Sequence, residues 1–427
     1  MTGRARLGAR CWLVGAAFGV VMAGATLPTP LYPLWRAEFA FSTLLITVIF
    51  AVYAVGVLGG LLGLGALSDV IGRRPVLGAA IVASAVSDLM FLAAGDVWVL
   101  LAARLVSGLA TGLVTGTATA AMIDLAPPGL RARASAAAIA GNTVGLASGT
   151  ALGGVLAEYV RWPLHLPYLL HLGLLALAWP VLFAVLPPGG RVRGARIRPQ
   201  RLGVPAEIRR PFWLASAAGA SGFAVLGVLN SVAALFLAQL AGVHNLALTG
   251  TLVGGCFAAI AVGQFAGRLV RPAARLPLAC AALVGAEAMQ AVSLAFGRVG
   301  VLVVGAGLAG AGIGLAIGHG LASINTDCPP ARRAEANSTF FAVMYAGLCL
   351  PVIGAGVMVD QYGLRAGGEV FSAVVASVAA VVGAVQLLAG AGYRSRTDGR
   401  TAASQPRHPS VGLPASSLPP SGATPNR

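Results

Sequence analysis

Residues 65–75 form a short charged stretch between two long apolar runs. It contains one acid, Asp69, followed four and five positions later by Arg73 and Arg74. One interpretation is local: Asp69 caps the next helix, where negative charge is favoured, and the arginines fix the side of the loop. The other is a switchable ion pair, because an exposed pair is worth about 1 kcal/mol or less and can break between two conformations. We expect the second, a conformational latch.

Among the ionisable residues inside apolar runs, we single out Asp88, Arg104, Glu287 and His319. An arginine there costs at least about 2.5 kcal/mol unless it is paired or faces water. Asp88 and Arg104 lie eight residues before and after Asp96, where two runs meet, so they have the same depth in neighbouring helices. This spacing predicts a buried Asp88–Arg104 pair, with either a proton-coupling or a purely structural role. His319 is a second candidate for coupling, and Glu287 is expected to be structural.

The composition places the chain in a bilayer. Hydrophobic residues make up 57% and charged residues 10%, and the mean hydropathy is +0.85; about a quarter of an average soluble chain is charged. The net charge of +16 could indicate nucleic acid, but the basic residues are all arginines in short loops and build no basic face. Five scattered cysteines lack metal-ligand spacing. We therefore expect no nucleic acid, metal, disulfide or cofactor.

Twelve apolar runs are long enough to span a bilayer, which takes about 20 residues. The sequence therefore predicts an all-α integral membrane protein with twelve spanning helices. The first run follows a basic segment and contains Ala23-Gly24-Ala25, as a secretory signal would, but it continues to Trp35 and is expected to stay uncleaved. The runs cover residues 11–34, 42–64, 76–94, 97–123, 135–157, 164–186, 211–237, 246–268, 276–296, 299–322, 338–359 and 367–391.

The arginines predict the orientation. Twenty-four lie in the termini and in the loops after even-numbered spans, four lie in the opposite loops, and Arg104 lies within a span. Arginine accumulates in cytoplasmic loops, so both termini are expected in the cytoplasm and the protein in the cell membrane.

The two halves of the sequence repeat. A shift of 202 residues aligns three glycines of the fourth span with three glycines of the tenth span. It also aligns the Pro-Pro pair and an arginine of the loop after the fourth span with those of the loop after the tenth span. The expected domains are an N-terminal six-helix bundle (1–186), a basic cytoplasmic linker (187–210), a C-terminal six-helix bundle (211–392) and a disordered cytoplasmic tail (393–427). Two six-helix halves are the plan of many secondary transporters.

At this point the sequence resembles the major facilitator superfamily over nearly all of residues 10–392. The loop after the second span is similar to the family's signature, and the fourth span is similar to its second motif. The fifth span resembles the motif associated with antiporters, but Thr150 replaces the family's proline. The matching residues are Gly65, Leu67, Asp69, Gly72, Arg73 and Arg74; Leu100, Arg104 and Gly108; and Gly145, Gly149, Gly153 and Gly154.

The resemblance implies that Arg73 meets Asp124 at the end of the fourth span, and that spans 1, 4, 7 and 10 line the substrate cavity. Those spans offer few polar groups, which favours a lipophilic or weakly polar substrate. Helix 1 contains no acid, unlike that of many proton-coupled drug exporters. The predicted cavity residues are Thr26, Thr29, Tyr32, Thr111, Thr115 and Asn230.

The leading hypothesis is a proton-driven exporter of small, fairly apolar compounds that works by alternating access. The expected partners are a small-molecule substrate, protons and the lipid bilayer, and a monomer is expected. A facilitator or importer of a neutral metabolite is the alternative. An integral-membrane enzyme is a distant third, because the sequence shows no catalytic constellation.

Overall fold

The computed structural model describes residues 3–65, 67–188 and 200–403. The described residues form helices joined by short connections, with no strand among them. Twelve helical segments are long and apolar enough to cross a membrane. The predicted fold class, an all-α protein with twelve spanning helices, is confirmed.

The spans run closely along the predicted segments. The first consists of α1 (Gly3–Thr26), the turn η1 (Thr29–Leu31) and α2 (Tyr32–Phe39), and the second of α3 (Thr43–Leu58) with the π turn η2 (Gly59–Gly63). A short helix, α4 (Leu67–Ile71), precedes the third. The others are α5 (Arg73–Leu92), α6 (Val97–Leu125), α7 (Arg131–Tyr159), α8 (Leu166–Val185), α9 (Arg209–Gln239), α10 (Leu246–Ala266), α11 (Pro272–Phe296), α12 (Val299–Asp327), α13 (Arg333–Tyr362) and α14 (Leu364–Ala403).

Local sequence signals explain several helix ends. Ser42, Asp96 and Asn245 cap α3, α6 and α10, each accepting a backbone N–H three residues later. The C-terminal end of α1 precedes Pro28 and Pro30, whose rings provide no N–H to continue its hydrogen-bond ladder. This leaves carbonyl groups free in the last turn of α1.

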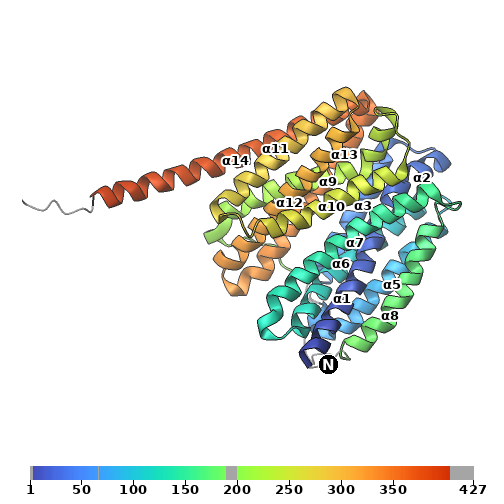
Figure 1. The fold of residues 1–427 in the computed structure, drawn as a ribbon, viewed down its shortest axis with the longest axis horizontal. Coiled ribbons are helices and arrows are strands. Elements are labelled where there is room, and N and C mark those ends of the chain that lie inside the picture. The colour runs from blue at the N-terminus through green and yellow to red at the C-terminus, as the bar shows by residue number, and fades with distance from the viewer. Residues whose placement is uncertain (1–2, 66, 189–199, 404–427) are drawn as a thin grey trace, which may run out of the picture. The chain divides into compact units, whose positions relative to one another are not determined.

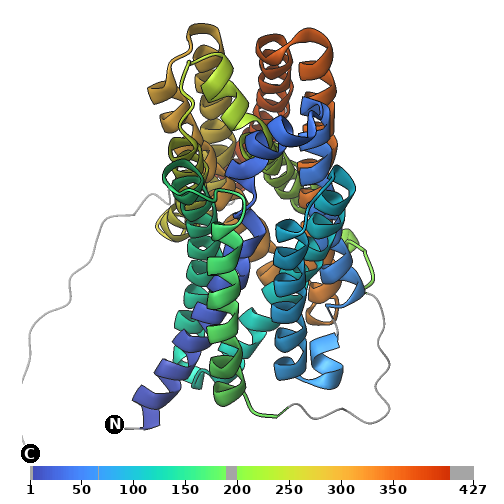
Figure 2. The same ribbon diagram turned by 90° about the vertical axis from the view of Figure 1, so that its right-hand side faces the viewer.

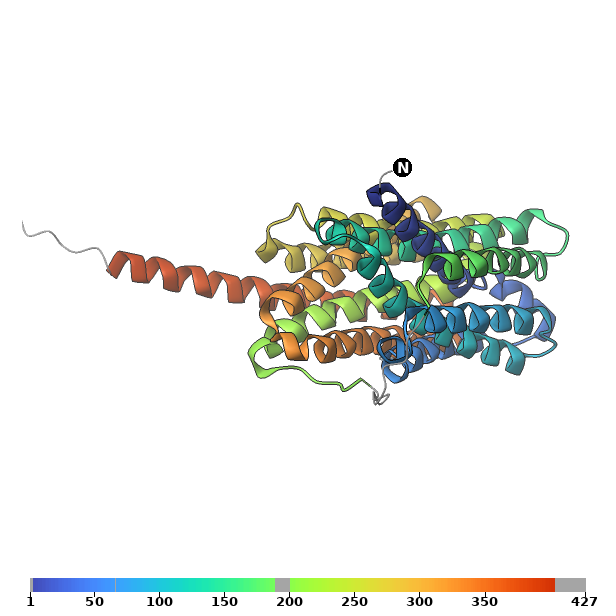
Figure 3. The same ribbon diagram turned by 90° about the horizontal axis from the view of Figure 1, so that it is seen from below.

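The chain divides into two compact units, residues 1–386 and 387–427. In the first unit the spanning helices of each half run side by side (Figures 1, 2 and 3). α1 packs on α6, α7 and α8 in the first half, and α9 packs on α12 and α13 in the second. The halves meet along two seams, α7 with α10 and α3 with α13. In the repeat, α3 corresponds to α10 and α7 corresponds to α13, so the two seams are equivalent, as expected for a repeated bundle.

The repeated glycines make equivalent contacts in both halves. A Cβ on Gly108 or Gly112 would overlap backbone carbonyls of α3, so α6 approaches α3 closely. Gly310 and Gly314 do the same for α12 on α10. Small residues of this kind let helix backbones approach in lipid.

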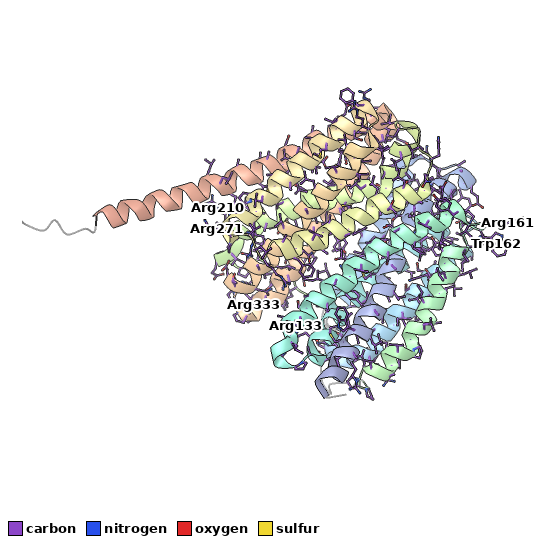
Figure 4. All side chains as sticks on the ribbon, in the orientation of Figure 1. Arg133, Arg161, Trp162, Arg210, Arg271 and Arg333 are labelled. Atoms are coloured by element: carbon purple, nitrogen blue, oxygen red, sulfur yellow. The ribbon has the colours of Figure 1, made fainter. Side chains whose placement is uncertain are left out.

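The two ends of the first unit differ in charge. Arg133, Arg210, Arg271 and Arg333 lie at one end of the helices, and Arg161 and Trp162 lie at the other (Figure 4). We call the first the latch end, because Asp69, Arg73 and Asp124 lie there, and the second the seam end, because α7 and α10 meet there.

Two connections differ from a simple chain of bundles. Part of the expected linker, residues 189–199, lies outside the described residues, but Gln200 donates its N–H to the Leu62 carbonyl at 2.9 Å and accepts a hydrogen bond from Ser338. α14 continues past residue 392, where the sequence predicted a disordered tail, because no proline interrupts it before Pro406. Residues 404–427 of that tail lie outside the described residues.

Candidate functional site

A cavity of about 540 Å³ lies between the halves. Eight spans line it: those of α1, α3 with η2, α6 and α7 in the first half, and those of α9, α10, α12 and α13 in the second. It reaches Ile123 and Ser135 at the latch end. Its lining is Phe18, Met22, Ala25, Thr26, Phe50, Tyr53, Leu61, Thr115, Gly116, Thr119, Ala120, Ile123, Ser135, Ala138, Ile139, Asn142, Thr143, Leu146, Phe223, Leu226, Asn230, Phe257, Ile260, Gln264, Ile317, Leu321, Phe341 and Tyr345.

The cavity wall is largely apolar, with a few hydroxyl and amide groups. Within the described chain, no residue on this wall is Asp, Glu, Arg or His. The polar groups are concentrated on α6 and α7 of the first half, which contribute Thr115, Thr119, Asn142 and Thr143 among others. Such a wall suits an apolar solute that forms a small number of hydrogen bonds.

Half of the predicted cavity residues do line it: Thr26, Thr115 and Asn230. The other three are buried beside it. Thr29 donates to the side-chain oxygen of Asn230 at 3.3 Å, across the halves, and Thr111 donates to the Ser107 carbonyl at 2.9 Å. Tyr32 lies against Arg104. Helical register explains the difference, because residues on one span face either the cavity or a neighbouring helix.

The seam end is closed by contacts between α7 and α10. Glu158 accepts the N–H of Leu246, the first residue of α10, at 2.8 Å, and the Asn245 side chain donates to the Tyr159 hydroxyl at 3.4 Å. Below this, a Cβ on Gly154 or Gly250 would overlap the backbone of the other helix. The cavity therefore extends to the latch end and is blocked at the seam end.

The latch brings Asp69 and Asp124 to one arginine. Arg73 contacts Asp69 at 2.5 Å through Nη1 and Asp124 at 3.3 Å through Nε, and Nη1 also donates to Ser68. The two carboxylates are exposed, by 67% and 62%. All four residues belong to the first half, so in this conformation the ion pairs do not cross between the halves.

The other predicted latch residues shape this loop. Gly72 precedes α5 with φ 96°, a conformation that favours glycine. A Cβ on Gly65 would overlap the Leu61 carbonyl. The Arg74 guanidinium lies 4.4 Å from the centre of the Phe183 ring, away from the two acids.

The predicted Asp88–Arg104 pair is wrong. Asp88 instead contacts His171 of α8, with 2.6 Å between Oδ2 and Nδ1, and His171 Nε2 lies 2.8 Å from the Val20 carbonyl of α1. Asp88 and Arg104 do lie at similar depth, because Ser87 donates to the Ala103 carbonyl. The count of residues gives height along a helix and not direction around it, and Asp88 faces α8 and α1.

His171 is the functional candidate that sequence reasoning missed. The signal was present, because His171 is an ionisable residue within an apolar run, as Arg104 is. A Cβ on Gly24 would overlap the His171 ring. Gly24, part of the apparent cleavage site in the sequence, therefore makes room for the imidazole.

Arg104 is completely buried and lies among aromatic rings. Its Nη1 donates to the Ala25 carbonyl at 2.8 Å, one of the free carbonyls in the last turn of α1. The guanidinium carbon lies 5.1, 5.6 and 5.8 Å from the ring centres of Tyr32, Tyr53 and Phe91. A cation is stabilised by aromatic faces and by the negative end of a helix dipole.

The second half carries an uncharged counterpart of Asp88–His171. Gln290 of α11 corresponds to Asp88 at the 202-residue shift, and its amide donates to Ser372 of α14 at 3.2 Å. Glu287, one turn earlier, is 1% exposed, and its carboxylate has no hydrogen-bond partner among the described residues. His319 of α12 is half-buried and absent from the cavity wall.

The glycines of α7 pack against α1. Cβ atoms on Gly145, Gly149 and Gly153 would overlap the carbonyls of Gly19, Ala23 and Leu27 in turn. Gly154 faces the other way, toward α10. Thr150, in the place of the motif's proline, is buried at the same seam and donates its hydroxyl to the Ala147 carbonyl at 3.0 Å.

The model of one family, the Major Facilitator Superfamily, matches residues 14–350. The chain belongs to this family. It is therefore a multi-pass membrane protein of a transporter family, as the motifs and the paired bundles indicated.

Two bacterial relatives match shorter stretches. An uncharacterised MFS-type transporter, YybF of Bacillus subtilis, is 28% identical over 141 residues, which is 33% of this chain and 34% of the relative. The inner membrane transport protein YnfM of Escherichia coli is 28% identical over 178 residues, or 40% and 41%. The matched stretches thus span less than half the length of either relative.

Solved structures share the fold over nearly the whole chain. A bacterial homolog of the human lysosomal transporter Spinster, in an inward-facing and unoccupied conformation, has a TM-score of 0.68 and 16% identity, covering 91% of this chain and 98% of that one. A mutant of the nucleoside transporter NupG has a TM-score of 0.66 and 13% identity, covering 90% and 99%.

Proposed function

We propose that this transporter exports small, lipophilic or weakly polar compounds from the cytoplasm and is driven by protons. The observation that carries the substrate class is the uncharged, mostly apolar wall of the 540 Å³ cavity. A sugar or dicarboxylate would call for several amides or arginines on that wall.

We also propose that the latch end faces the cytoplasm. The arginine distribution supports this orientation, because four of the labelled arginines lie at the latch end of the helices (Figure 4). The structure then represents the inward-facing state, with the cavity accessible from the cytoplasm and the α7–α10 seam closed. Alternating access requires the seam to open while the latch end closes.

The proton carrier in this proposal is the Asp88–His171 pair. The Val20 carbonyl can only accept, so His171 Nε2 carries a hydrogen. A second proton must lie between Nδ1 and Asp88, because two acceptors would otherwise face each other at 2.6 Å. When this proton leaves, the lone pair of His171 Nδ1 faces the carboxylate of Asp88, and the two side chains separate. The contact of His171 with the Val20 carbonyl of α1 is then disturbed, and α1 lines the cavity.

Other ionisable groups of the described chain are buried near this pair. Arg104 of α6 and the Tyr168 phenol of α8 are buried nearby, and the ring of Tyr32, the first residue of α2, lies against Arg104. When a proton leaves the Asp88–His171 pair, the net charge of the first half therefore becomes more negative, while the positive charge of nearby Arg104 stays fixed. This change in local charge favours a movement of α1 when the Asp88–His171 pair loses its proton.

The test is reconstitution into liposomes with an imposed pH gradient and a panel of compounds graded by polarity. We expect apolar compounds to move against their gradient only when a proton gradient is present. Movement that only equilibrates a neutral metabolite, with no response to pH, would establish the facilitator instead. Uptake driven in the opposite direction would establish an importer.

A further inference from the structure

Arg104 is a buried cation without a counter-ion. Its side chain is 0% exposed, and none of the ion pairs in the described chain, taken to 4.0 Å, includes it. Nη1 is held by the Ala25 carbonyl, but Nε and Nη2 have no hydrogen-bond partner in the same residues. Asp88, the nearest candidate by depth, is engaged by His171. Arginine does not lose its proton in proteins, so the charge persists.

This charge lies directly behind the cavity wall. Arg104 is bonded to the backbone of Ala25 and lies 5.6 Å from the ring centre of Tyr53, and both residues line the cavity. Only one layer of side chain and backbone therefore separates the guanidinium from a bound solute. No acid on the described wall compensates its field.

We propose that the cavity selects apolar molecules that carry one negative charge, with the anionic group oriented toward Ala25 and Tyr53. A hydrophobic carboxylate is the simplest member of this class. The proposal rests on the proposed transport function and narrows its substrate class. It excludes lipophilic cations as preferred substrates, because the cavity offers them no carboxylate.

The expected preference can be calculated from Coulomb's law. For charges about 10 Å apart and an effective dielectric constant of about 20, the interaction favours an anion over a neutral isostere on the order of tenfold. A cation of the same shape is disfavoured by a similar factor. The aromatic rings around Arg104 stabilise its charge without neutralising it, so they do not cancel this field.

The test compares three probes of nearly equal shape: phenylbutyrate, phenylbutyramide and phenylbutylamine. Their dissociation constants are measured by calorimetry on the full-length purified protein. We expect phenylbutyrate to bind about tenfold more tightly than the amide, and the amine to bind most weakly. Equal binding of the three, tighter binding of the amide or amine, or no binding by phenylbutyrate would overturn the proposal.

Variants at Asn142 and at Arg104 test whether charge causes the preference for phenylbutyrate. Asn142→Asp adds a carboxylate to the cavity wall with little change in shape, and we expect it to remove the preference for phenylbutyrate; Asn142→Ser is the uncharged control and should keep it. Arg104→Gln should make phenylbutyrate and the amide bind equally. Because removal of a buried arginine can prevent folding, the Asn142 variants provide an independent test. A preference unchanged in Asn142→Asp contradicts the proposal.

Transport of the same probes separates this inference from the proposed function. Selective binding of phenylbutyrate without movement across liposomes under any gradient would refute transport of this class and leave anion selection supported. Gradient-driven movement of all three probes at equal rates would support transport and refute anion selection.

Discussion

The carboxylate of Glu158 accepts the backbone N–H of Leu246 across the seam between the two halves, at 2.8 Å. Leu246 begins α10, so the acid meets both a free N–H and the positive end of a helix dipole. This contact joins the halves at the end where the cavity is blocked.

We predict that Glu158→Gln weakens closure of the seam end. The amide keeps a hydrogen-bond acceptor but loses the charge, which costs about 1 kcal/mol and shifts the population of the two states about fivefold. Spin labels at Arg161→Cys and His244→Cys, both exposed at this end, should report longer distances. The five native cysteines are buried. Glu38→Gln, at another exposed acid of this end, is the control and should leave the distances unchanged.

The second prediction concerns the glycine contacts of the same seam. Gly250→Val should prevent α10 from approaching Thr150 of α7, because its Cβ would overlap the Thr150 carbonyl. We expect gradient-driven transport to fall more than tenfold, with normal amounts of protein in the membrane. Gly255→Val on the same helix faces open space and should transport normally. Full activity of Gly250→Val would show that this close approach is unnecessary.

At the latch, we predict that one substitution abolishes transport and leaves the stability of the protein nearly unchanged. Asp69 and Asp124 are more than half exposed, so Asp69→Asn should change the free energy of unfolding by less than about 1 kcal/mol. Transport should nevertheless be abolished, because Arg73 loses one of its two acidic partners. Thermal unfolding and liposome transport measure the two effects, and Glu207→Gln, an exposed acid in the chain before α9, serves as the control. An Asp69→Asn protein with normal transport would reduce the stretch to a topological signal.

The fourth prediction tests the proton carrier. His171→Gln can still bond to the Val20 carbonyl but cannot hold the second proton, so accumulation against a gradient should be lost at every pH. Exchange of labelled for unlabelled substrate, which needs no net proton movement, should continue. Asp88→Asn should behave in the same way. His165→Gln replaces an exposed histidine near the start of α8 and should resemble the parent protein.

Much of the fold was predictable from sequence because lipid imposes strong constraints. Spans must be long and apolar, and Pro, Gly and capping residues such as Ser42 and Asp96 mark their ends. The repeat was also legible, since Gly108 and Gly310 make equivalent contacts. The Arg73–Asp124 contact expected from the family resemblance is present.

The site was less predictable because its residues depend on rotation about each helix axis. A residue count placed Asp88 and Arg104 at one depth, but their side chains turn to different neighbours, His171 and the Ala25 carbonyl. In an apolar run, nearly every face is hydrophobic, so the pattern of residues does not reveal which face meets the cavity. The sequence predicts Tyr32 and Thr111 on the wall for this reason, but both side chains are packed behind it.

In the described part of the first half, the buried basic side chains of His171 and Arg104 both contact backbone oxygens of α1: His171 contacts the Val20 carbonyl, and Arg104 donates to the Ala25 carbonyl. A proton on the Asp88–His171 pair and an anion bound in the cavity near Arg104 would therefore act on the same helix, α1. Thermodynamic linkage requires such effects to be reciprocal: if a proton weakens anion binding by some factor, the anion weakens proton binding by that factor. The two binding equilibria would then share a single coupling free energy, and one titration of each against the other would measure it.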